Sequence, residues 1–318
     1  MKNQIIYLFF ALSFLSCKNE KLDNQVKSLK QQTCLKLGYK NNKIAPIWID
    51  ALKTRQKKEY LDSIKQITRP LSKEENNWVK LIESRLNYWS SIKDSIKVPF
   101  SDVFINDTTF VLLGYTGYDD GFSYKDKTVC FDVTALNREY GSALDSINTN
   151  RMDRLFAHEY THLLSKSWAK KNHLKLSTYQ DDILWECIYE GFGMYRSMSR
   201  KWFPVDGNLS DVSFKTFETL YPIFVERLIT IDTLKNPSES DKIKYHKNLS
   251  RGSMKQKWGA LPIGVWLAME SKGDDSKLNE WVNKGPDAVI LLAQKYLTGE
   301  SKITFEKHFN LKKEKTNY

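Results

Sequence analysis

The chain has 318 residues, of which 41% are hydrophobic and 13% aromatic, and its formal net charge is +11. This length and apolar content suffice for one domain or two closely packed subdomains, and the aromatic content excludes a largely disordered chain. The basic residues are dispersed, so we interpret the charge as a solvated surface, which argues against nucleic acid as a partner.

The first residues predict export. Lys2 precedes an apolar run from Ile5 to Leu15, which matches a secretory signal core and is too short for a stable membrane span. The run ends at Phe14-Leu15-Ser16-Cys17, which resembles a bacterial lipobox. The resemblance implies that residues 1–16 are a signal peptide and that Cys17 becomes lipidated. We therefore expect an exported protein of the bacterial cell envelope, anchored to a membrane by its lipid.

Residues 17–42 are polar and rich in lysine, glutamine and asparagine, which is typical of a tether. Residues 43–98 predict an N-terminal helical region, because apolar residues recur at helical spacing. Within it, Ser72 and Glu75 form a capping box at the start of a helix whose apolar stripe includes Trp78 and Trp89. These aromatic residues are interpreted as core.

The pattern changes to β-branched and aromatic runs between Val98 and Val133. Short strands are predicted at residues 103–105, 110–113 and 128–131, with a turn at 114–121. A small sheet therefore precedes the next helix in the chain.

That helix is predicted from Asn150 to Lys166, with Asn150 and Asp153 as a capping box at its start, and it carries the sequence His158-Glu159-Tyr160-Thr161-His162. Two histidines four residues apart lie about 40° from each other on a helix and roughly 6 Å apart, so one metal ion can bind both. Glu159 lies to the side of the pair, where it can take a proton from water that attacks a carbonyl. The alternative is a helix whose two histidines are solvated or are satisfied in the core.

Residues 185–195 predict a second helix with Glu186 and Glu190 on one face among apolar residues. A carboxylate in such a setting is costly unless it is paired or bound to metal, so either can be a third ligand. An acid that does not bind the metal can instead accept a hydrogen bond from the other ring nitrogen of a ligand histidine, and Glu186, Asp181 and Asp182 are candidates for this role. Glycines at 191 and 193 allow another backbone to approach closely.

The motif HEYTH, followed 28 positions after His162 by Glu190-Gly191-Phe192-Gly193, resembles the gluzincin metallopeptidases. The resemblance covers roughly residues 103–198 and is close to predicted zinc-dependent proteases among bacterial lipoproteins. It implies His158, His162 and Glu190 as ligands of Zn²⁺ and Glu159 as the general base. Because glycine follows Glu190, that residue is favoured over Glu186. Gly193 stands where the family usually has alanine.

Cys34, Cys130 and Cys187 remain besides Cys17, and export permits one disulfide whose pairing the sequence leaves open. Cys187 lies three residues before Glu190, but a small buried side chain is the expected role. Residues 201–318 predict a C-terminal helical subdomain. A metallopeptidase also needs a donor for the developing oxyanion. The candidates are Tyr195, Tyr221, Tyr245 and His246, and the last two are favoured because they lie in a polar loop.

These features predict a mostly helical α+β, zincin-like domain, in which residues 99–200 form the core with a small sheet packed on the HExxH helix. The predicted function is zinc-dependent hydrolysis of peptide bonds in a peptide or protein substrate, and the oligomeric state stays open. The main alternative is a noncatalytic envelope lipoprotein that uses a zincin scaffold for binding or assembly. A third possibility is a lysine-rich binder of anionic polymer at the cell surface.

Overall fold

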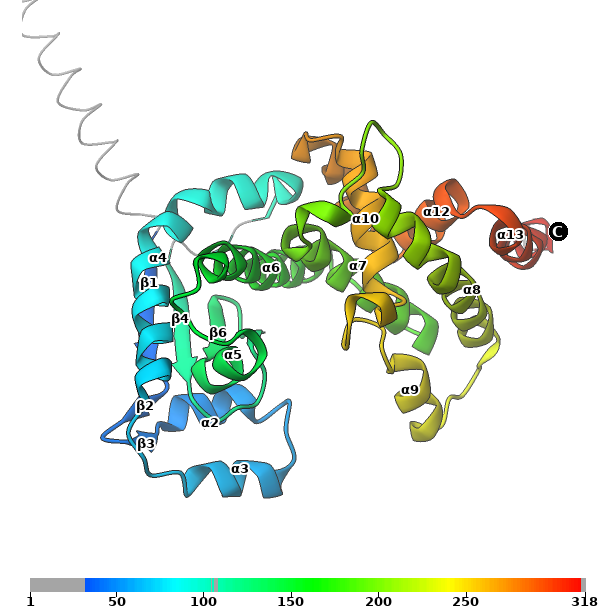
Figure 1. The fold of residues 1–318 in the computed structure, drawn as a ribbon. Helices are drawn as coiled ribbons and strands as arrows, with labels where there is room; N and C mark the ends of the chain where they lie inside the picture. The colour runs from blue at the N-terminus through cyan, green and yellow to red at the C-terminus, as the bar shows by residue number, and fades with distance from the viewer. Residues whose placement is uncertain (1–31, 104, 106–107, 316–318) are drawn as a thin grey trace, which may run out of the picture. The chain divides into compact units, whose positions relative to one another are not determined.

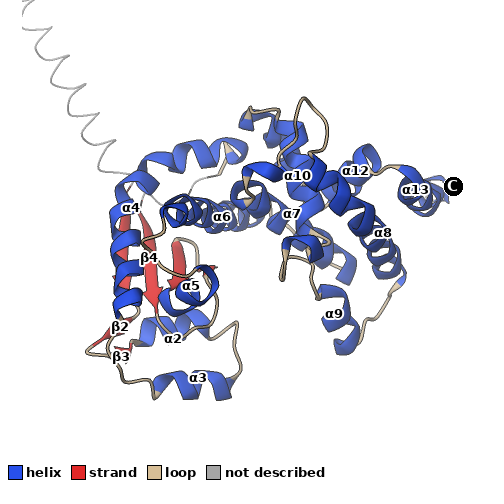
Figure 2. Ribbon diagram, viewed as in Figure 1, coloured by secondary structure: helices blue, strands red, loops and turns tan. Residues whose placement is uncertain are grey.

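A computed structural model describes residues 32–315 except 104, 106 and 107. These residues are mostly helical with a small sheet, which confirms the expected α+β class (Figure 1, Figure 2). The described residues among 1–93, 106–120 and 127–142 form one compact unit, and those among 94–105, 121–126 and 143–318 form a second. The segment predicted to be a signal peptide, residues 1–16, and the predicted lipidation site Cys17 lie outside the described residues.

The first unit contains a parallel arrangement of strands. β1 (Gln32–Leu37) pairs with β4 (Thr108–Gly114), which pairs in turn with β6 (Thr128–Asp132). Every residue of β6 is buried, and its centre is the apolar run Val129-Cys130-Phe131. A short antiparallel ribbon joins β2 (Tyr39–Lys40) to β3 (Lys43–Ile44).

Two expectations about this region are wrong. Residues 32–40 were expected in a tether, but most of them form strands β1 and β2, so the folded part of the chain begins earlier. Val103 and Ile105 were expected in a strand, but both lie outside strands and are buried in the loop that follows a 3-10 turn at Val98–Phe100.

The helices that belong at least in part to the first unit are α2 (Pro46–Leu52), α3 (Lys58–Lys65), α4 (Lys73–Lys97) and α5 (Val133–Tyr140). The predicted capping box of α4 is present, because the Glu75 amide donates to Ser72 Oγ at 3.1 Å and the Ser72 amide donates to the Glu75 carboxylate at 2.8 Å. Glu75 also accepts two hydrogen bonds of 2.7 Å from the Arg69 guanidinium. Trp78 and Trp89 are fully buried, which confirms their interpretation as core.

The second unit holds one described strand and most of the helices. They are β5 (Gly121–Tyr124), α6 (Ser146–Lys171), α7 (Tyr179–Ser197), α8 (Asp211–Thr233), α9 (Glu239–His246), α10 (Ala260–Ser271), α11 (Asn279–Lys284), α12 (Asp287–Tyr296) and α13 (Gly299–Lys315). Short 3-10 turns at Arg200–Trp202, Met254–Gln256 and Asp275–Leu278 lie between them.

Helix α7 is central to this unit, because it packs against both α6 and α10. The contact with α10 is close. A Cβ added at Gly191 would lie 2.3 Å from an Ile263 carbon, and one added at Gly264 would lie 2.9 Å from Met194. The expectation that a glycine of this helix permits a close approach is therefore confirmed for Gly191.

Among the described residues no helix combines the length and apolar character needed to cross a bilayer. The three cysteines in the same part of the chain, Cys34, Cys130 and Cys187, are all free thiols.

Candidate metal centre

Helix α6 presents the two motif histidines on one face. Its start differs from the expectation: the helix begins at Ser146, and the side chain of Asp145 accepts a hydrogen bond from the Ile147 amide. The expected cap at Asn150 is therefore wrong, since a suitable acceptor lies one turn earlier. The Nε2 atoms of His158 and His162 lie 2.9 Å apart, and the two side chains are 13% and 5% exposed.

Helix α7 brings the carboxylate. It begins at Tyr179, earlier than expected, because Thr178 and Asp181 form a reciprocal capping box. Asp181 thus caps the helix and does not hold a ligand histidine. The Glu190 carboxylate lies 3.6 Å from Nε2 of His158 and 3.6 Å from Nε2 of His162.

The three donor atoms suit one metal ion. They form a triangle with sides of 2.9, 3.6 and 3.6 Å. The point equidistant from its corners lies about 2.0 Å from each, which is the length of zinc bonds to imidazole nitrogen and carboxylate oxygen. Among the described residues, this is the group of histidine, cysteine and acidic side chains that converges closely enough to hold an ion.

Glu186 is engaged elsewhere. Its carboxylate lies 3.0 Å from Nε2 of His246, the last residue of α9. Nδ1 of His246 lies 3.0 Å from the Lys242 carbonyl oxygen and 3.2 Å from the Tyr179 hydroxyl. The structure therefore brings Glu190 to the two motif histidines and Glu186 to His246.

Gly193 makes room for His158. An ideal Cβ at this position would lie 2.7 Å from Cε1, 2.8 Å from Nε2 and 2.9 Å from Nδ1 of the imidazole. Real Cβ atoms essentially never approach another heavy atom this closely, so any side chain at 193 would displace the ring. The His158 ring therefore lies against the backbone of α7 at Gly193.

Further contacts orient the two rings. Nδ1 of His158 lies 3.0 Å from the hydroxyl of Ser197, at the end of α7. The ring of Tyr189 stacks on that of His162, with centroids 4.0 Å apart and an angle of 7° between the planes. The Tyr189 hydroxyl lies 3.4 Å from Ser123 Oγ, which accepts a 2.7 Å hydrogen bond from Lys166. A hydrogen bond to one imidazole and a ring stack on the other limit rotation of both.

Opposite charges in the site shift the pKa values of its acidic and basic groups. Burial raises the pKa of the Glu190 carboxyl, but the neighbouring His162 and His158 outweigh burial and the pKa is lowered overall. Burial likewise acts to lower the pKa of His158, yet the Glu190 hydrogen bond and the charges of Glu159 and Glu190 raise it. Lys257 lowers the pKa of both groups through its positive charge. Glu159 is 5% exposed and follows His158 directly.

The four candidate oxyanion donors are not among the converging ligands. Tyr195 donates a 2.5 Å hydrogen bond to Asp275, and the Tyr221 hydroxyl accepts one of 3.0 Å from Trp266. Tyr245 is buried beneath the Arg227 guanidinium, 5.2 Å from its ring centroid. His246 has both ring nitrogens within hydrogen-bonding distance of protein groups, as described above.

Ser197, Tyr189 and Lys257 also lie at the site and were not predicted from the sequence. Ser197 lies seven residues after Glu190 and so on the same helix face, a signal that was lost because the helix was expected to end near residue 195. Tyr189 precedes Glu190 in the chain, but its stacking depends on how α6 and α7 pack. Comparison with family models, curated proteins and solved structures finds no match for this chain.

Proposed function

We propose that this protein is a zinc-dependent peptidase in which His158, His162 and Glu190 hold the ion and Glu159 is the general base. The observation that carries the proposal is the convergence of three donor atoms on a point about 2.0 Å from each of them. Two imidazoles and one carboxylate leave a fourth position open, as catalytic zinc sites do. The gap at Gly193 that accommodates the His158 ring also supports it.

Zinc in this position supplies Lewis-acid chemistry to a carbonyl and to water. The residues of the chain supply the rest. Glu159 accepts the proton of the attacking water and later delivers it to the leaving amine. Its burial strengthens that role, because a carboxylate shielded from solvent interacts strongly with nearby charge. Ser197 and Tyr189 keep the two imidazoles oriented.

A zincin-like arrangement and a lipid-anchored place in the cell envelope belong to the same proposal. The first is supported by the order of strand β5, helix α6 and helix α7, and by the contact of β5 with α6. The second rests on Lys2, the apolar run after it and Cys17, all outside the described residues. The substrate is then a peptide or protein at the membrane surface.

Metal analysis and cleavage of a peptide library test the proposal on the purified protein and three variants. Wild type should hold about one zinc per chain and cleave peptides. Glu159→Gln should keep the zinc and lose cleavage, whereas His158→Ala should lose both. Glu186→Gln is the matched control, because it changes a carboxylate one turn from Glu190 that lies outside the ligand group. It should retain zinc and cleavage.

Two results would count against the peptidase. If the wild-type protein binds no zinc, the proposed metal centre is contradicted. A protein that binds zinc but cleaves nothing in a broad library favours the noncatalytic scaffold, since the ligands would then serve structure or binding.

A further inference from the structure

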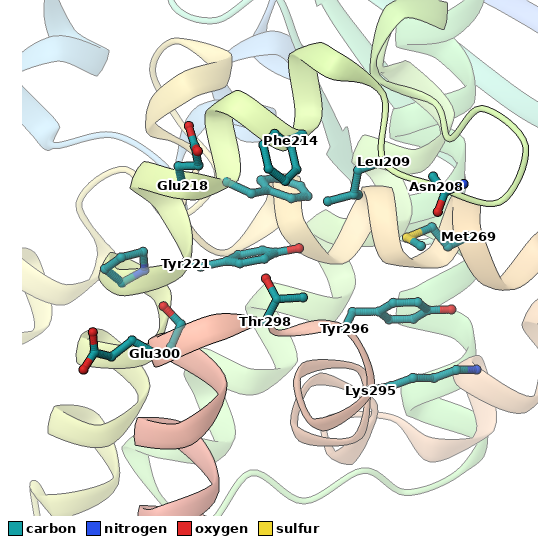
Figure 3. Close-up of a pocket in the computed structure, with 13 residues that line it drawn as sticks. Asn208, Leu209, Phe214, Glu218, Tyr221, Met269, Lys295, Tyr296, Thr298 and Glu300 are labelled. Carbon is teal, nitrogen blue, oxygen red and sulfur yellow. The ribbon is translucent and has the colours of Figure 1, made fainter.

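A pocket lies in the same unit, between α8, the end of α10, the end of α12 and the start of α13 (Figure 3). Its volume of about 620 Å³ is in the range of small-molecule sites. None of its lining residues belongs to the metal centre. Its walls are largely apolar and include Phe214, Phe217, Tyr221, Met269 and Tyr296.

One face of α8 supplies much of the wall. Phe214, Phe217, Glu218 and Tyr221 follow one another at helical spacing and all line the pocket. Phe217 and Tyr221 are 1% and 5% exposed, but Phe214 is 58% exposed although it continues the same apolar stripe. An aromatic ring at the mouth of a pocket offers a face that a ligand can cover.

Two rings in the wall are held in place by hydrogen bonds. The hydroxyl of Tyr221 accepts from Trp266 Nε1 at 3.0 Å, and the hydroxyl of Tyr296 donates to the Glu270 carboxylate. Their rings are therefore fixed before any ligand arrives, which reduces the ordering that binding requires.

The charged lining is unbalanced. Glu218 on α8 and Glu300 on α13 both line the pocket and are exposed (Figure 3), and within the described part of the chain neither forms an ion pair. The basic residue of the lining, Lys295, has its ammonium 2.5 Å from the carboxylate of Glu270, so its charge is already matched. The pocket thus carries two uncompensated negative charges in a chain whose net charge is +11.

We propose that this pocket binds an organic cation with an apolar body. The ammonium or guanidinium group lies beside Glu218 on α8 or Glu300 on α13, and the apolar part packs on Phe214 and Tyr221. Aromatic rings attract such cations through their negative faces, and the two carboxylates add charge complementarity. The same chemistry is offered by a free amine and by a lysine or arginine side chain of a peptide beside apolar residues.

Calorimetric titration of the full protein at low salt tests the proposal with three probes of similar size, phenylbutylamine, phenylbutanol and phenylbutyrate. The amine should bind about tenfold more tightly than the alcohol, and the carboxylate more weakly still. The double variant Glu218→Gln/Glu300→Gln should lose the tenfold preference for the amine. Glu239→Gln/Glu280→Gln changes the net charge equally at exposed sites outside the pocket and should keep it.

Two capped tripeptides separate the sources of the cation, acetyl-Leu-Lys-Leu amide and the same peptide with norleucine in place of lysine. If the natural ligand is a peptide, the lysine peptide should bind more tightly than both the norleucine peptide and phenylbutylamine. If the natural ligand is a free amine, phenylbutylamine should bind more tightly than the lysine peptide. Equal binding of the three small probes, a preference that survives in the Glu218→Gln/Glu300→Gln protein, or no saturable binding of the amine at millimolar concentration would each overturn the proposal.

Discussion

Replacing Gly193 by alanine should separate metal binding from stability. The added Cβ would lie 2.7 Å from Cε1 of His158, whereas ordinary contacts begin at 3.4 Å, so the ring must move by about 0.7 Å. Metal ligands must be placed within about 0.2 Å of their ideal distances. We expect zinc affinity to fall about 10-fold to 100-fold, the usual effect of disturbing the support of a ligand. Alanine also favours the helix by up to about 1 kcal/mol, so the metal-free protein should not lose stability.

Gly191→Ala provides the contrast, because it adds the same methyl group two residues away on the same helix. There the Cβ would meet Ile263 at 2.3 Å and disturb the packing of α7 on α10. This variant should melt at a lower temperature while the folded protein keeps near-normal zinc affinity. The assays are competition with a chelating dye and thermal melting of metal-free protein. Wild-type zinc affinity in Gly193→Ala would refute the reasoning that the His158 ring needs the space left by this glycine.

Three further predictions concern other parts of the structure. Tyr189→Leu should weaken zinc binding about tenfold by removing the stack on His162, and Tyr189→Phe, which keeps the ring, should restore most of it, as dye competition would measure. Burial acts to raise the pKa of Glu75, but its hydrogen bonds to Arg69 lower it to about 2, so its stabilisation should be present above about pH 4.5 and be lost as the pH falls toward 2. Glu75→Gln should cost about 3 kcal/mol in urea unfolding at pH 7, and a constant difference between the two proteins down to pH 2 would contradict this. Burial raises the pKa of the Cys187 thiol, so iodoacetamide should modify it only after unfolding, and modification in the native protein would argue against its burial.

The parts of the site that local periodicity governs follow from the sequence. Two histidines four residues apart in a helical pattern must share a face, and the structure places them there with Nε2 atoms 2.9 Å apart. The same holds for the capping box of α4, which depends on Ser72 and Glu75 alone.

The parts that depend on packing between distant segments do not follow from the sequence. Glu186 and Glu190 share a face of α7, so the sequence alone does not distinguish their roles. The structure distinguishes them because His246 of α9 pairs with Glu186. Strand β1 has one buried residue, Thr33, and no buried apolar stripe that would mark it as a strand. Its pairing with β4 depends on residues far along the chain. Phe214 fits an apolar stripe, yet it lies at the mouth of a pocket.

The measurement that tests the central claim most directly is a crystal structure of the protein grown with Zn²⁺. We expect one ion bonded to Nε2 of His158, Nε2 of His162 and a carboxylate oxygen of Glu190, each at about 2.0–2.2 Å. The account would be contradicted by an ion that binds Glu186 in place of Glu190. It would also be contradicted if the electron density at saturating zinc showed no ion between the two imidazoles.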